Sequence, residues 1–244
     1  MKRFAAAAFI AAAVLVPQSA FAQDPTTPST QPAQGSSSAQ GSSSSKSGVG
    51  SWLVADSWAG GATGVVITNR TGGEVYGEVG KKNVWHNLDF SIEAGWMSTV
   101  VSQHRLDSAG AIVNYLSQTQ GQPASSSIKV PAGYGVFNVR KTVYSTERYD
   151  VYAIGGIGFA VTSPKTTFVL GGTDISGNLG QYGVTLGKDL AGSSTSALLN
   201  LGGGVTLPFA SKWFGDVSYR FTPIFTANEA TKVSRFNFGV ARRF

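Results

Sequence analysis

The chain ends with the stretch Val233-Ser-Arg-Phe-Asn-Phe-Gly-Val-Ala-Arg-Arg-Phe244. Its apolar side chains alternate with polar or small ones, so Phe236, Phe238, Val240 and Phe244 share one face and Arg235, Asn237, Gly239, Ala241 and Arg243 share the other. A period of two places these sets on opposite sides of a β-sheet. The stretch therefore predicts a strand with one apolar and one polar face.

The same alternation recurs upstream. It is clearest over residues 213–222, 196–209 and 151–162, and weaker candidates cover 128–140, 90–101, 74–82 and 60–70. The intervening segments alternate between a tight turn at 210–212 and long polar connections at 102–127 and 163–194. Short turns on one side and long loops on the other are typical of membrane barrels. Residues 166–170 and 173–176 suggest that strand pairs continue beyond the membrane.

These segments predict an all-β fold: a closed, antiparallel, up-and-down transmembrane β-barrel of eight strands. A ten-stranded barrel is the alternative if residues 52–57 and 111–115 also form strands. Glycine clusters at 155–156 and 202–204 lie within the alternating segments, where they would permit tight curvature.

Composition agrees with a barrel in lipid. Only 13% of residues are charged, 11% are aromatic and 31 are glycine, whereas soluble domains contain about 25% charged residues. An apolar outer wall around a polar lumen accounts for this balance. No window beyond the N-terminal segment could form a spanning helix.

The N-terminus has the organisation of a secretory signal peptide. Lys2 and Arg3 precede an apolar run over residues 4–16, and Ala20-Phe21-Ala22 predicts cleavage after Ala22. Residues 23–50 are rich in Pro, Thr, Gln, Ser and Gly and predict a disordered tail. The barrel domain is then expected over residues 51–244, with no cysteine for a disulfide or a lipid anchor.

Loss of the signal peptide would leave 17 basic and 13 acidic residues and reduce the formal charge from +6 to +4. The basic residues occur singly or in pairs, without the aromatic interleaving of a nucleic-acid site. Nucleic acid is therefore not an expected partner.

The alternation directs several charged side chains inward. Asp216 and Arg220 share one strand face, and Glu93, Arg140 and Arg235 are candidates to join them. Buried charges must be paired, and an eight-stranded lumen is only wide enough for side chains. We therefore expect a salt-bridge network that plugs the lumen. A narrow gated path for ions or small solutes is the alternative.

The aromatic residues outside the final strand predict girdles at the two membrane interfaces. The candidates are Trp58, Trp85, Trp96, Trp213, Tyr144, Tyr149 and Tyr219. A soluble, lipocalin-like barrel with an apolar interior is the other interpretation.

Catalysis and cofactors have little support. His86 is expected in a short turn and His104 in a loop near Arg105 and Asp107, and neither would be held rigidly beside a nucleophile. Two isolated histidines without cysteine cannot supply a tetrahedral metal set. The glycine pairs and triplets lack the lysine and helix of a phosphate-binding loop. We expect no enzyme activity, metal or other cofactor.

The final stretch resembles the closing strand of bacterial outer-membrane barrels, and Tyr152–Phe159 and Asp216–Phe221 are similar to strands of the opacity and OmpA-like families of small barrels. This resemblance implies an eight-stranded, non-enzymatic barrel in the outer membrane. It also implies that Phe236, Phe238, Val240 and Phe244 are read by the barrel-assembly machinery, although Arg242 departs from the usual apolar residue. The expected role is structural or adhesin-like, with any extracellular ligand bound by the long loops.

Overall fold

The structure is a computed structural model that describes residues 56–187, 189–226 and 229–244. The predicted signal peptide, residues 1–22, and the predicted tail, residues 23–50, lie outside the described residues.

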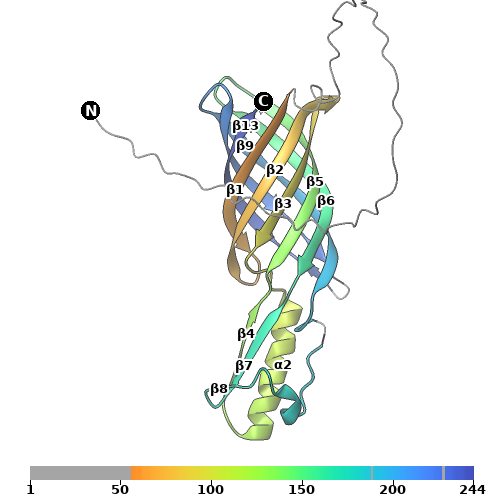
Figure 1. Ribbon diagram of the computed structural model, residues 1–244, viewed down its shortest axis with the longest axis vertical. Helices are drawn as coiled ribbons and strands as arrows, with labels where there is room; N and C mark the ends of the chain where they lie inside the picture. Colours follow the sequence, from red (N-terminus) through yellow and green to blue (C-terminus); the bar gives the residue numbers. More distant parts are fainter. Residues whose placement is uncertain (1–55, 188, 227–228) are drawn as a thin grey trace, which may run out of the picture. The chain divides into compact units, whose positions relative to one another are not determined.

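Eight long antiparallel strands form a closed barrel (Figure 1). They are β1 (Ser57–Ile67), β2 (Thr71–Trp85), β3 (Leu88–Met97), β5 (Ala132–Ser145), β6 (Asp150–Thr162), β9 (Ser194–Pro208), β10 (Trp213–Phe221) and β13 (Ser234–Arg243). Each strand pairs with its neighbour along the chain, and β13 also pairs with β1 from Trp58↔Arg243 to Ile67↔Ser234. The prediction of an eight-stranded up-and-down barrel is confirmed, and the ten-stranded alternative is wrong.

One end of the barrel carries short turns. The β2–β3 connection contains His86 and Asn87, whose φ angles are 47° and 62°. Positive φ at both central residues is the geometry of a tight hairpin turn that matches the twist of the strands. Residues 146–149 join β5 to β6, and residues 209–212 join β9 to β10. This turn end also holds both ends of the barrel sequence, Ser57 and Phe244, whose backbones are hydrogen-bonded (2.9 Å).

The opposite end carries a folded extension, drawn below the barrel in Figure 1. The β3–β5 connection forms α2 (Gln103–Gln120) and β4 (Ala124–Lys129), and the β6–β9 connection forms β7 (Lys165–Leu170), β8 (Thr173–Asp174) and the 3₁₀ helix η1 (Leu179–Tyr182). Strands β4, β7 and β8 make a separate three-stranded sheet. The suggested strands at 166–170 and 173–176 thus correspond to β7 and β8, which Gly171 and Gly172 join with positive φ.

Helix α2 corrects two expectations. Residues 111–115, a possible strand, and His104, expected in a loop, both lie in α2. The helix begins after Ser102, whose side chain accepts a hydrogen bond from the Arg105 backbone, and ends at Gly121 in the left-handed conformation. These are ordinary N-terminal and C-terminal helix caps.

Two short strands complete this end of the molecule. They are β11 (Ile224–Phe225) and β12 (Ala230–Thr231), which pair with each other, and β11 also pairs with β9. Within residues 56–187, 189–226 and 229–244, none of the helices has the length and apolar character needed to cross a membrane.

Candidate functional site

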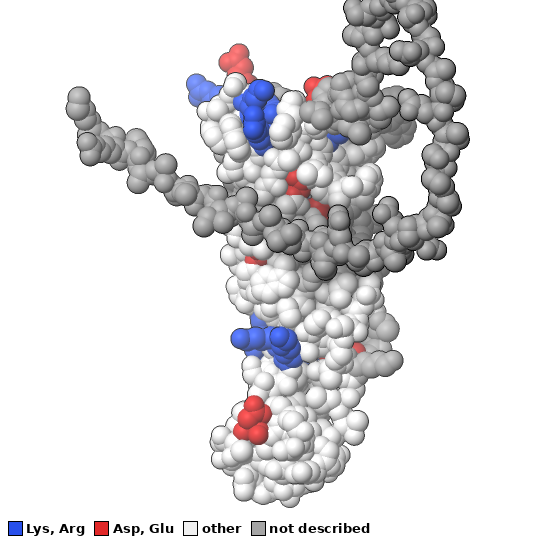
Figure 2. Space-filling view, viewed as in Figure 1, with Lys and Arg blue, Asp and Glu red and all other residues white. Residues whose placement is uncertain are grey.

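The outer wall of the barrel is apolar. Ile157, at the middle of β6, is 68% exposed, and Phe238 on β13 is 61% exposed. Others include Val75, Val79, Ile92, Phe137, Phe159, Leu201, Val217 and Phe236. Where the wall is visible in Figure 2 it is largely uncharged between its two ends. Soluble monomers rarely expose large contiguous apolar patches, so this many exposed apolar side chains on one wall is unusual for a soluble protein.

Polar and charged side chains cluster inside the lumen, although barrel strands also bury apolar residues such as Val66, Met97 and Val136. Glu93 and Arg235 are 0% exposed and Arg220 is 1% exposed. Further buried polar residues that point inward are Glu74, Glu78, Asn138, Arg140, Asn200, Thr206, Ser218 and Asn237. The barrel thus reverses the usual arrangement of a globular protein, in which apolar side chains are inside.

Glu93 lies at the centre of the main ion-pair network. Its Oε1 is 2.5 Å from Nη2 of Arg235, and its Oε2 accepts a hydrogen bond from Arg220. Arg235 Nε also donates to Oε2 of Glu74 (2.9 Å), and Arg220 Nη2 lies 3.4 Å from Oε2 of Glu78. The two guanidinium groups are therefore shared among three carboxylates contributed by β2 and β3.

Neutral groups add hydrogen bonds to this network. The Tyr134 hydroxyl accepts from Nη2 of Arg235 (2.6 Å) and lies 2.9 Å from Oε1 of Glu93. Asn138 donates to Oε2 of Glu93 (3.1 Å), and Asn200 donates to Asn138 (2.8 Å). Buried charges are tolerated when such bonds satisfy their remaining lone pairs and protons.

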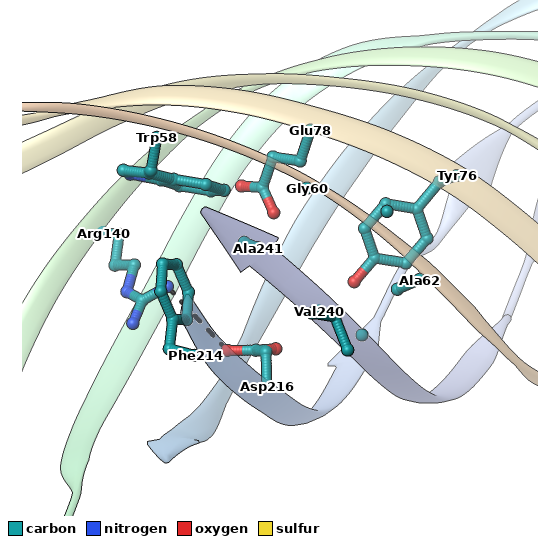
Figure 3. A pocket seen from close by; sticks show the side chains of 12 residues that line it. Trp58, Gly60, Ala62, Tyr76, Glu78, Arg140, Phe214, Asp216, Val240 and Ala241 are labelled. Carbon is teal, nitrogen blue, oxygen red and sulfur yellow. Dashed lines mark ion pairs between the residues drawn. The ribbon is translucent and has the colours of Figure 1, made fainter. Parts of the chain in front are cut away.

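A second ion pair lies nearer the turn end. Arg140 Nη1 is 3.9 Å from Oδ2 of Asp216, whose Oδ1 accepts from the Tyr152 hydroxyl (2.9 Å). The guanidinium carbon of Arg140 lies 3.4 Å from the centre of the Tyr152 ring. Gly204 makes this possible, because a Cβ there would collide with the Tyr152 hydroxyl. Figure 3 shows Arg140 and Asp216 facing each other beside Phe214.

The five lumen residues named from the sequence therefore fall into two groups. Glu93, Arg220 and Arg235 belong to the central network, and Arg140 and Asp216 form the second pair. Glu74 and Glu78 on β2 also belong to the network, although they were not among the residues expected there. The alternation of Glu74, Tyr76 and Glu78 with valine and glycine carried that signal.

A cavity of about 20 Å³ lies beside the second pair and is lined by Trp58, Tyr76, Glu78, Arg140 and Asp216, among others. This volume accommodates about one water molecule. Nε of Arg140 and Nε of Arg220 are buried without a hydrogen-bond partner in the described structure. Of these two arginines only Arg140 lines the cavity, so the cavity offers room for about one water molecule beside that side chain.

The aromatic residues occupy both ends of the outer wall, with one exception. Trp85, Trp213, Tyr144 and Tyr149 are exposed near the turn end, whereas Trp96 and Tyr219 are exposed towards the extension. Trp58 was expected in a girdle, but this is wrong. It is 5% exposed and points into the lumen, where its ring packs edge-on against Phe214 at 6.1 Å.

The two histidines lie at opposite ends of the molecule. His86 is in the β2–β3 turn, with its ring 4.8 Å from that of Trp85. His104, on α2, places Nε2 3.3 Å from Oδ2 of Asp189, with both side chains almost half exposed. In the described part of the chain, no three His, Cys, Asp or Glu residues converge as a metal site.

Several solved structures are similar to this chain in fold. Neisserial surface protein A is 13% identical, with 77% of this chain and 96% of that chain covered and a TM-score of 0.43. The N-terminal β-barrel domain of Pseudomonas aeruginosa OprF is 12% identical (78% and 98% covered, TM-score 0.45). A major outer membrane protein from Thermus thermophilus is 11% identical (77% and 99% covered, TM-score 0.45). No family model and no curated protein matches the chain.

Proposed function

We propose that this chain is an outer-membrane β-barrel protein with a structural or surface-interaction role, without enzymatic activity, and with a lumen plugged by paired charges. The observation that carries the proposal is the reversed polarity of the barrel: isoleucine, valine and phenylalanine face outward, while Glu93, Arg220 and Arg235 are buried inside. This arrangement has a lower free energy in the hydrocarbon core of a membrane than in water.

The strand lengths support this surrounding. A tilted strand needs about 9–11 residues to cross the hydrocarbon core, and the barrel strands contain between 9 residues in β10 and 15 in β2 and β9. Because β1 pairs with β13, the barrel has no open edge with unpaired backbone groups. A lipocalin-like interior would be apolar, which is the opposite of the observed lumen.

The test of membrane residence is the behaviour of the purified protein. We expect it to require detergent for solubility and to migrate differently on a gel before and after boiling. A full chain that stays monomeric in water without detergent, and migrates alike in both states, would refute the proposal. The mass of the mature protein isolated from cells would test the predicted export and the cleavage after Ala22.

The charged lumen supports a barrel that has no open pore. Ion pairs and guanidinium hydrogen bonds cross it from β2 and β3 to β10 and β13. Glu93 pairs with both arginines, so its removal would leave each buried guanidinium with one carboxylate fewer. We therefore expect near-zero single-channel conductance in planar bilayers.

A narrow channel for ions or small solutes is the second candidate, favoured by the cavity beside Arg140 and Asp216. The Asp216→Asn substitution should then raise conductance, because it removes the charge that holds Arg140. Near-zero conductance in both proteins would eliminate the channel, and measurable conductance in the wild type would eliminate the plug.

The surface-interaction role rests on the extension, which would face outward while the turn end faces the periplasm. It has an apolar core that includes Leu116, Ile128 and Phe168, so it could present a folded surface to an extracellular ligand. Cleavage of the extension by protease added to intact cells would support this orientation, and protection with cleavage only after lysis would refute it.

Assembly of the barrel would use its last strand. Phe236, Phe238, Val240 and Phe244 are all exposed on the outer wall of β13 and its end, where the barrel-assembly machinery could bind them. Deletion of Phe244 should lower the amount of folded barrel in cells but leave refolding in detergent unchanged. Equal losses in both settings would indicate a structural role only.

A further inference from the structure

Three basic residues lie together where the extension leaves the barrel. Lys129, the last residue of β4, is directly opposite Lys165, the first residue of β7. Arg70, in the β1–β2 loop, donates from Nη1 to the backbone carbonyl of Ile128 (3.3 Å), the residue before Lys129. All three are exposed. We refer to Arg70, Lys129 and Lys165 as the basic cluster, and Figure 2 shows basic side chains gathered just beyond the barrel wall.

The cluster lacks acidic partners. Among the described residues, neither Lys129 nor Lys165 takes part in an ion pair. Like charges directly opposite on neighbouring strands destabilise a sheet. The next pair on the same exposed face, Ser127 opposite Thr167, supplies hydroxyl donors. Ammonium, guanidinium and hydroxyl groups on one face are donors suited to phosphate oxygens.

The position of the cluster relative to the apolar wall indicates the source of that phosphate. Ile67 is exposed at the end of β1, and Arg70 lies three residues after it. Val161 is exposed on β6, and Lys165 lies four residues after it. Four extended residues span at most about 13 Å, and the headgroup layer extends about 5–8 Å beyond the hydrocarbon. Because lysine and arginine side chains bend back towards an interface, the cluster reaches the level of lipid headgroups.

We propose that Arg70, Lys129 and Lys165 form a binding site for the phosphate groups of lipids in the leaflet around the extension. This inference rests on the proposed membrane location. The bound phosphate would offset the repulsion between the two lysines and would fix the height of the extension above the bilayer. Free phosphate in solution is the competing source of the same chemistry.

The test is lipid binding by the full chain in a phosphate-free detergent, followed by native mass spectrometry. The probes are a bis-phosphorylated lipid A, its dephosphorylated form and inorganic phosphate. The variant is Lys129→Gln with Lys165→Gln, and the matched control is Lys141→Gln with Lys212→Gln, which removes the same charge at the turn end. Heat modifiability of each protein checks that the barrel has folded.

We expect the wild type to retain the phosphorylated lipid in preference to the dephosphorylated one. A basic residue near a lipid surface contributes about 1 kcal/mol to binding, and each 1.4 kcal/mol changes the affinity about tenfold. The double variant should therefore bind the phosphorylated lipid about 30-fold more weakly than the wild type. The affinity of the control should change by less than about twofold. Equal retention by the variant and the wild type would overturn the site. Equal occupancy by inorganic phosphate would overturn the lipid source. A water-soluble chain that is not heat-modifiable would instead refute the membrane proposal, so the two failures are distinguishable.

Discussion

The barrel and the extension bury opposite kinds of residue. The barrel interior holds Glu93, Arg220 and Arg235, whereas the extension interior holds Leu116, Ile128 and Phe168, and all six side chains are almost fully buried. Outside, the barrel wall exposes residues such as Ile157, and the sheet of the extension exposes serine, threonine and lysine. The two regions alternate polar and apolar residues under the same rules of strand geometry, so the difference reflects the medium around each of them.

This contrast also separates two sources of stability. In the extension, apolar burial provides the favourable free energy. In the barrel, the outward apolar residues contribute only through transfer into lipid, and the interior depends on the pairing of its buried charges. Substitutions that are harmless in one region should therefore be costly in the other.

The largest effect is expected for Glu93→Ala. Glu93 contacts both Arg220 and Arg235, so its removal leaves two buried guanidinium groups short of a counter-charge. The free energy of unfolding should fall by about 3–5 kcal/mol, measured by urea unfolding in detergent micelles. The control is Glu147→Ala in the exposed β5–β6 turn, which should change stability by less than about 0.5 kcal/mol. Similar values for the two variants would contradict a stabilising network.

The Leu116→Ala substitution applies the same reasoning to the extension. Leu116 is fully buried on α2, and its truncation should cost about 2–5 kcal/mol of local stability. We expect rapid tryptic cleavage after Lys129 or Lys165, while heat modifiability of the barrel persists. Gln118→Ala, on the exposed side of α2, is the control. Loss of heat modifiability in Leu116→Ala would show that the two regions unfold as one unit.

The Ile157→Arg substitution distinguishes lipid from water outside the barrel. Near the bilayer midplane an arginine on the outer wall should cost about 2–4 kcal/mol, whereas Asn114→Arg on the exposed surface of α2 should cost less than about 0.5 kcal/mol. Unfolding of both variants in lipid vesicles provides the measurement. A negligible cost at Ile157 would mean that water reaches the middle of the wall.

The sequence was sufficient to predict the barrel because the alternation of apolar and polar residues is local and is repeated in each strand. Arg220 on β10 lies between Tyr219 and Phe221, and Arg235 on β13 directly precedes Phe236, so their inward direction follows from alternation alone. Trp58 was misplaced for a physical reason. Its face of β1 continues with Gly60, Ala62 and Gly64, which are too small to indicate a side.

The extension was less predictable because its structure is not local. The β4–β7 pairing joins residues from two different connections of the barrel, and no period along the chain encodes that contact. Helix α2 has few large apolar residues, among them Leu106, Ile112, Val113 and Leu116. Its clearest signals were the terminal residues Ser102 and Gly121, which together could have indicated a helix.

The smallest predicted effect concerns a carboxylate that the extension stabilises without arginine. Asp174 Oδ1 accepts hydrogen bonds from the Ser176 backbone (2.9 Å) and hydroxyl (2.6 Å). These bonds lower the pKa of Asp174 below its ordinary value of 3.8, because they favour the charged form. Ser176→Ala removes the larger contribution and should raise the pKa of Asp174 towards that value, as measured by NMR titration of its side chain.

The sign of the pH dependence follows from this shift. Because the folded state has the lower pKa, the Asp174 contribution to stability is fully present above 3.8 and disappears as the pH falls through the folded value. The control Ser125→Ala, on the exposed face of β4, should leave the titration of Asp174 unchanged. If Ser176→Ala also leaves it unchanged, local hydrogen bonds do not hold this charge. The carboxylate of Asp174 would then differ from those of the lumen for a reason other than hydrogen bonds from serine in place of arginine.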